Sequence, residues 1–180
     1  MLLRKNEYFG ESTYGEGLES VMSTVRTMCR QERDWTCSVA SLRTLMSGCR
    51  DIKLPSEDFI LETYGLTKGP YNSKDILDKG LLNDLTFKAG CIDPAPSKNQ
   101  LVFLTGLMQD YNVMIECLIN YAHWIVLLGY VKLGNIEQDM FIYYDPYYHR
   151  INTIIVDELI SMWYDIGEHP LHRDYIAISK

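Results

Sequence analysis

Four polar residues, spread over most of the chain, have the types that acyl-transfer chemistry requires. Gln31 lies six residues before Cys37, His123 begins a long apolar run, and Asp145 stands directly before Pro146. A thiol attacks best when it is ionised, and an imidazole can promote this and later protonate the leaving group. A carboxylate can fix the imidazole tautomer, and an amide N–H can stabilise an oxyanion. We therefore predict Cys37 as nucleophile, His123 as base, Asp145 as the group that orients the base, and Gln31 in the oxyanion hole.

The elements around these residues are expected to bring them together. Residues 36–46 carry apolar side chains at helical spacing, which places Cys37 at a helix N-terminus, where the helix dipole favours an anion. His123 opens one predicted strand, and Asp145 ends the next. If these strands are antiparallel neighbours, His123 and Asp145 meet at one end of the sheet, where the helix with Cys37 must dock.

The periodicity of the chain predicts helices in its first part and strands in its second. The expected helices cover residues 18–28, 36–46, a segment after Pro55 with Ser56 as cap, 73–79, 97–110 with a Ser97–Gln100 capping box, and 157–164. The expected strands cover 113–119, 123–130, 140–144, 151–155 and 175–179. This order predicts one α+β domain over residues 1–180, with 1–17 as an extended or mobile lead-in.

The composition and the net charge of the chain limit the classes of function that it can have. The chain has 180 residues, 47% hydrophobic and 23% charged, which is typical of a soluble globular protein. A formal net charge of -7 disfavours nucleic acid as the partner, and no apolar run approaches a membrane span. The expected partner is a peptide or protein substrate. No cofactor is expected, and the oligomeric state stays open.

The five cysteines indicate a reducing compartment. Their number is odd and they lack the paired spacings of zinc sites, so at least one thiol should be free. The first residues lack the apolar core of a secretory signal. We expect a cytoplasmic protein, although export by a machine that reads no cleaved signal would leave the same sequence.

Several other side chains are candidates for substrate contact or metal binding. Trp35 and Ser38 flank the pair Thr36–Cys37, and Trp124 follows the proposed base, so we expect these three near the substrate. Trp124 shields the imidazole from water or fills the core. Tyrosines near Asp145 line a peptide groove or pack in the core and rim. Of the remaining polar groups, Glu168, His169, His172 and Asp174 fit a solvated loop better than a metal site, and Glu57, Asp58 and Glu62 fit an exposed helix face.

At these residues the sequence resembles the papain-like cysteine peptidases, and among them the bacteriocin-processing family that removes double-glycine leader peptides. The matching residues are, in order, Gln31, Cys37, Val39, Ala40, Leu42, His123, Gly129, Tyr130, Asp145 and Pro146. The resemblance implies a papain-like fold and a Cys-His-Asp triad with a Gln. The chain departs from the family pattern at Thr36 and Ser38, where the family usually has Asp or a similar polar residue and Gly. No transporter segment follows and no Gly-Gly occurs, so self-processing at such a site is not expected.

Three functions fit this set of residues. The first is a cysteine peptidase. The second is an acyl transferase or a glutamine deamidase that uses the same triad, acting in its own cell or as a toxin delivered into another. The third is an inactive binding module on a papain-like scaffold, which the side chain of Ser38 after the nucleophile would favour.

Overall fold

The computed structural model describes residues 20–49, 52–69, 71–92, 96–119, 121–134, 137–163 and 173–180. The predicted lead-in at 1–17 lies outside this part. The elements run, in chain order, β1 (Val21–Met22), α1 (Cys37–Met46), α2 (Glu57–Thr63), α3 (Ser73–Asp78), β2 (Phe87–Ile92), α4 (Ser97–Asp110), β3 (Tyr111–Ile119), β4 (Tyr121–Val131), β5 (Met140–Asp145), β6 (Arg150–Ile155), α5 (Val156–Met162) and β7 (Arg173–Ser179).

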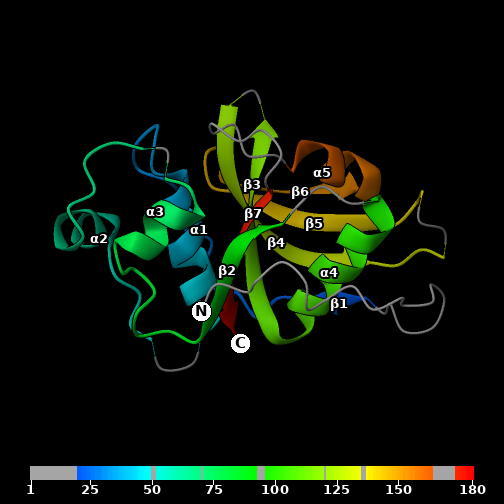
Figure 1. Cartoon of the computed structure of the whole chain (residues 1–180), viewed down its shortest axis with the longest axis horizontal. Coiled ribbons are helices and arrows are strands. Elements are labelled where there is room, and N and C mark those ends of the chain that lie inside the picture. The colour runs from blue at the N-terminus through cyan, green and yellow to red at the C-terminus, as the bar shows by residue number, and fades with distance from the viewer. Residues whose placement is uncertain are drawn as a thin grey trace.

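An antiparallel sheet forms the middle layer of the molecule. Its strand order is β2-β7-β3-β4-β5-β6, with β1 paired to β4. Helices α1, α2 and α3 lie on one side of the sheet, and α4 and α5 on the other (Figure 1). The predicted α+β class is therefore confirmed.

Two apolar cores, one on each face of the sheet, explain the continuous apolar run of β4. Trp124 and Val126 belong to the core under α1, whereas Ile125 and Leu127 belong to the core under α4 and α5. Successive side chains of a strand point to opposite faces, so a strand covered on both faces is apolar throughout. β4 is such a strand, and it gives the site a rigid support.

Helix α1 is attached to β4 in a way that fixes where its first residue lies. Ser41 Oγ donates to the Trp124 carbonyl oxygen at 3.1 Å, and both groups are buried. Cys37 lies one helical turn before Ser41, so it reaches the end of β4 that carries His123. The neighbouring strand β5 is paired to β4 with Val126 opposite Tyr144, which brings His123 and Asp145 to the same end of the sheet, as predicted.

The predicted helix over residues 18–28 is wrong. Over its described residues, 20–28, only the short strand β1 forms, and the backbone that follows is irregular. Its N–H groups bond to side chains of other elements: Thr24 N–H donates to Asn112, and Thr27 N–H donates to Ser47 Oγ. These tertiary bonds replace the local bonds that a helix would make.

Two further expectations at helix and strand boundaries are corrected. Strand β2 was not predicted, because its sequence, with Lys88 and Gly90 inside it, is a weak strand signal. The Ser97–Gln100 capping box does not form: Pro96 is the N-cap of α4, and the Gln100 side chain is buried. The range of α4 agrees with the prediction, as does the Ser56 cap of α2.

Candidate active site

Cys37 is the first residue of α1 and is almost completely buried, with 3% of its surface exposed. The preceding Thr36 makes no side-chain cap to the helix; its hydroxyl donates to the Arg33 carbonyl oxygen instead. The first turn of α1 carries no acidic residue. The N–H groups without a side-chain cap and the positive end of the helix dipole therefore lie at the end of α1 that begins with Cys37, and such an end can stabilise an oxyanion.

His123 and Asp145 form a buried ion pair at the ends of β4 and β5. The Nε2 atom of His123 lies 2.9 Å from Oδ1 of Asp145, and the two residues are 2% and 3% exposed. With Nε2 held by the carboxylate, Nδ1 is the ring nitrogen that remains for the thiol, and Cys37 is close enough to raise the pKa of the imidazole. The structure thus places Cys37 near the His123–Asp145 pair.

The surroundings of His123 and Asp145 shift the pKa of each residue in the direction that favours its charged form. Burial alone would lower the pKa of His123, but the bond to Asp145 and the nearby Cys37 outweigh burial and raise the pKa to about 9. For Asp145, burial alone would raise the pKa. The hydrogen bond to His123 and two backbone N–H groups outweigh burial and bring the pKa of Asp145 below its ordinary value. The imidazolium and the carboxylate therefore stabilise each other.

Asp145 also sets the shape of the turn that follows it. Its Oδ1 accepts the backbone N–H groups of Tyr147 at 2.9 Å and Tyr148 at 3.3 Å. The Pro146 carbonyl oxygen in turn accepts the backbone N–H of Gln31 at 3.1 Å. The carboxylate that holds the base thus also holds a turn with two aromatic rings, and this turn binds the segment before the nucleophile.

The Gln31 side chain lies at this junction and is largely buried. Its Nε2 donates to the Arg33 carbonyl oxygen at 2.8 Å. This contact fixes the amide orientation, because a flipped amide would place two acceptor oxygens against each other. Nε2 carries two hydrogens, so the bond to Arg33 uses only one of its two N–H donors.

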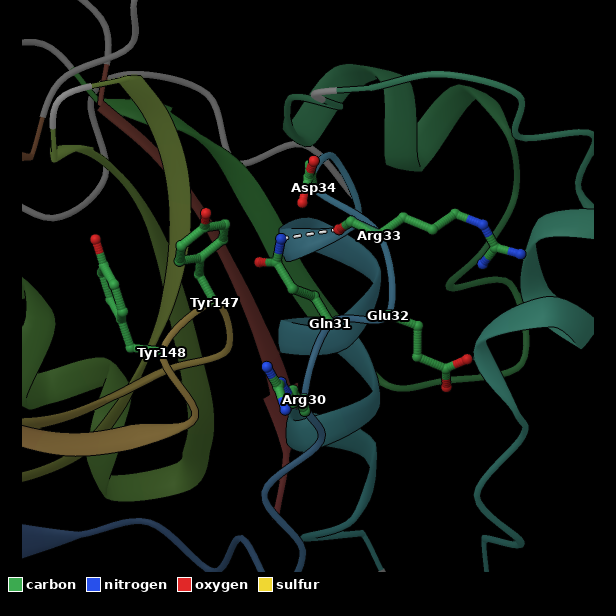
Figure 2. A pocket seen from close by; sticks show the side chains of 7 residues that line it. All are labelled: Arg30, Gln31, Glu32, Arg33, Asp34, Tyr147 and Tyr148. Atoms are coloured by element: carbon green, nitrogen blue, oxygen red, sulfur yellow. Dashed lines mark hydrogen bonds between the residues drawn. The ribbon is translucent and has the colours of Figure 1, made fainter.

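A cleft of about 630 Å³ opens beside Gln31. Its walls are the segment before α1 and the turn after β5, and its lining residues are Arg30, Gln31, Glu32, Arg33, Asp34, Tyr147 and Tyr148. Figure 2 shows the Gln31 side chain between Asp34 and Tyr147, whereas the Arg33 side chain extends away toward α2. Of the four predicted catalytic residues, Gln31 lines the cleft, whereas Cys37, His123 and Asp145 are not among its lining residues.

Glu57, at the start of α2, fixes the wall of the cleft that carries Gln31. Its carboxylate is buried and accepts the Glu32 backbone N–H and the Arg33 guanidinium, each at 3.2 Å. The expectation of an exposed helix face is therefore wrong for Glu57, although Asp58 and Glu62 are exposed. No local sequence signal separates Glu57 from its neighbours, because its partners lie on a distant loop.

Replacing Glu57 with alanine is expected to lower the free energy of unfolding by about 2 kcal/mol, because the Glu32 N–H and the Arg33 guanidinium lose a buried acceptor. Chemical denaturation measures this change. Glu62→Ala, on the exposed side of the same helix, is the matched control and should stay within about 0.5 kcal/mol of the parent. Equal effects of the two substitutions would contradict the anchoring role of Glu57.

The three residues that were expected to contact the substrate differ in how far they are buried. Trp124 is completely buried and donates from Nε1 to the Tyr71 carbonyl oxygen at 2.8 Å, so it fills the core and cannot line a cleft. Ser38 is buried as well. Trp35 is half-buried beside Tyr71. The expected tyrosine groove is reduced to Tyr147 and Tyr148.

The four residues that were expected to form a solvated loop are described only in part. Glu168, His169 and His172 lie outside the described residues, and Asp174 accepts hydrogen bonds from Ser73. Within the described ranges, no group of three His, Cys, Asp or Glu residues is placed to hold a metal ion. No helix of the described chain has the length and apolar character to cross a membrane.

The crystal structure of UfSP from C. elegans, a cysteine protease with a papain-like fold, resembles this fold over most of the chain. The TM-score is 0.53 at 16% sequence identity, and the match covers 94% of this chain and 35% of the UfSP chain. This chain thus spans about a third of the length of that protein. No protein-family model matches the chain, and no curated protein matches it significantly. The fold is papain-like, as predicted, whereas the comparisons do not support the narrower resemblance to bacteriocin-processing peptidases.

Proposed function

We propose that the chain is a cysteine peptidase that hydrolyses a peptide bond in a peptide or protein. One observation carries the proposal: Nε2 of His123 lies 2.9 Å from a buried carboxylate, and the Cys37 thiol at the first residue of α1 is close enough to raise the pKa of the same imidazole. A nucleophile, a base and a group that orients the base, placed together, are the parts that thiol acyl transfer needs. The papain-like fold is consistent with this chemistry.

In the proposed mechanism, Cys37 attacks the substrate carbonyl carbon as a thiolate and forms a tetrahedral intermediate. The oxyanion accepts the Cys37 backbone N–H and the remaining N–H of Gln31. The protonated His123 gives its proton to the leaving amine, and the C–N bond breaks. His123 then takes a proton from water, which attacks the thioester and releases the acid and the free thiol. Asp145 holds the imidazole throughout, and no step needs a cofactor.

The cleft beside Gln31 is where we place the polypeptide substrate. Tyr147 and Tyr148 lie edge to face with ring centroids 4.9 Å apart, and they offer apolar contact beside the scissile bond. Arg30 and Asp34 supply charges of both signs to the rim. For this chain we propose only the substrate class, a peptide or protein.

Mass spectrometry of products from a peptide library tests the reaction. Hydrolysis gives two fragments whose masses add to the parent plus water. Acyl transfer instead attaches the acyl fragment to an amine, and deamidation of glutamine raises the mass by about one dalton. The first result supports the proposal. Either of the others, or no product at any protein concentration while the thiol stays reduced, contradicts it.

Changing Gln31 to glutamate is expected to lower kcat by about 10²- to 10³-fold, because the side chain keeps its shape but loses the N–H donor. KM should change little, since the donor acts on the oxyanion rather than on the ground state. Steady-state kinetics on a cleaved peptide separate the two parameters. Glu32→Gln, at the next position of the same loop, is the control. A loss confined to KM would contradict an oxyanion role for Gln31.

A further inference from the structure

Strand β6 lies at the edge of the sheet, and it lacks the features that usually prevent an edge strand from pairing with another chain. Within the described chain it pairs with β5 alone. Its alternate side chains Ile151, Thr153 and Ile155 are exposed on one face, with 57% of Ile151 and 43% of Ile155 accessible. Natural edge strands usually carry lysine, proline or a bulge that blocks pairing with another chain, and β6 has none of these between Ile151 and Ile155. The edge is therefore ready to accept a further strand.

The two ends of β6 carry opposite charges. Arg150 begins the strand, and Asp157 and Glu158 form the first turn of α5 directly after it. All three are exposed, and none makes an ion pair with another described residue. A strand that is basic at its start and acidic beyond its end is complementary to an antiparallel copy of itself.

We propose that β6 pairs with β6 of a second copy of this chain, antiparallel about a two-fold axis at Thr153, so that the two sheets join. In this register Ile151 lies opposite the partner's Ile155, and Thr153 lies opposite itself. Residues opposite each other in an antiparallel pair share a face, so β-branched side chains meet across the axis. Such a two-fold contact uses each residue twice.

The opposite charges at the two ends of β6 favour this register over others, and a second copy of the chain over another partner. With the axis at Thr153, Arg150 of each copy lies beside the acidic turn at Asp157 and Glu158 of the other. With the axis at Ile151, Arg150 would instead lie opposite the partner's Asn152, and the charges would separate. An unrelated polypeptide would match the apolar edge, but it would have no reason to match both charged ends. The observations therefore favour self-association over an unrelated strand.

The dimer would also border the cleft. Tyr148 lies two residues before β6, so the partner's Asp157 and Glu158 would come to the rim formed by Tyr148. Each cleft would then have an acidic edge supplied by the other copy. This contact does not depend on the reaction at Cys37, because it uses only the edge strand and the turn beyond it.

Sedimentation velocity of the full chain over a range of concentrations tests the proposal. The samples contain a reducing agent, because Cys91 is exposed and disulfide formation would imitate a dimer. A reversible monomer–dimer equilibrium is expected. Ile155→Lys should raise the dissociation constant by about 30-fold, since the change occurs twice and brings lysine near Arg150 of the other copy. Phe59→Lys makes the same kind of change on α2, at a residue 57% exposed, and should leave the constant unchanged.

A charge exchange makes the test specific to the register. Arg150→Glu alone should weaken the dimer, and adding Asp157→Lys and Glu158→Lys should restore it, which no general loss of stability would do. A monomer at every concentration, a dimer insensitive to Ile155→Lys, or failure of the charge exchange would overturn the proposal. Hydrogen-exchange protection of β6 that appears only when a peptide binds to a monomeric Cys37→Ala protein would assign the edge to a substrate and overturn it equally.

Discussion

Replacing Cys37 with alanine is expected to lower kcat/KM toward a cleaved peptide on the order of 10⁴-fold, because no other group can form the acyl-enzyme. The fold should persist, since the change removes one buried sulfur from the start of a helix that other contacts hold in place. Initial rates on a peptide identified by mass spectrometry measure the loss, and circular dichroism checks the fold. A peptidyl electrophile should label Cys37 in the parent protein and leave the variant unmodified.

The matched control is Cys91→Ala, which removes an exposed thiol on β2 and should leave the rate within about twofold of the parent, as surface substitutions away from a site usually do. Cys37→Ser tests the chemistry more finely, because a hydroxyl keeps the shape but ionises poorly beside an imidazole. Full peptidase activity in Cys37→Ala would exclude Cys37 as the nucleophile, whereas a cellular effect of the protein that survives Cys37→Ala without peptide cleavage would favour the binding-module interpretation. Loss of activity in Cys91→Ala instead would move the nucleophile to another thiol.

The parts of the site that were predictable from the sequence are those that depend on local pattern. Apolar residues at helical spacing after Cys37 predicted its helix, and the apolar run after His123 predicted a strand. From these two elements and the next strand, the meeting of His123 with Asp145 followed, because antiparallel neighbours share an end. Periodicity is informative here since each element buries a long apolar surface.

The parts that were not predictable depend on contacts between distant segments. The segment 18–28 has helical spacing, yet its N–H groups bond to Asn112 and Ser47, which no local pattern reveals. Glu57 has the same local surroundings as exposed acids, yet it is buried because the loop with Arg33 folds against it. Sequence spacing gives the face of a helix but does not say what covers it.

Trp124 illustrates the same limit at the site itself. Its place beside the base suggested a cleft wall, but alternation along β4 sends adjacent side chains to opposite faces. Trp124 therefore lies in the core under α1 while His123 meets Asp145. The residues that do line the cleft, Tyr147 and Tyr148, lie there because Asp145 holds their turn through two backbone bonds. One carboxylate thus positions the base and shapes the cleft.

The stability of the protein is expected to depend on pH through His123 and Asp145. The folded-state pKa of His123 is about 9, above its ordinary value of 6.5, so its contribution is complete below about pH 6.5 and is lost as the pH rises through about 9. Its full size is about 3 kcal/mol. Asp145 has a lowered pKa, so its contribution is present above its ordinary value of 3.8 and is lost as the pH falls through the folded-state value. The two contributions arise from one ion pair and are not added.

Asp145→Asn provides the test, because the amide keeps the size of the side chain and removes its charge. Denaturant unfolding at pH 6 and pH 9 should show the parent losing stability between these values and the variant losing much less. The experiment needs no substrate, so it examines the ion pair independently of the reaction. Equal pH dependence in both proteins would mean that the imidazole is not held by Asp145 in solution. The orientation of Nδ1 toward Cys37, on which the proposed mechanism depends, would then have no support.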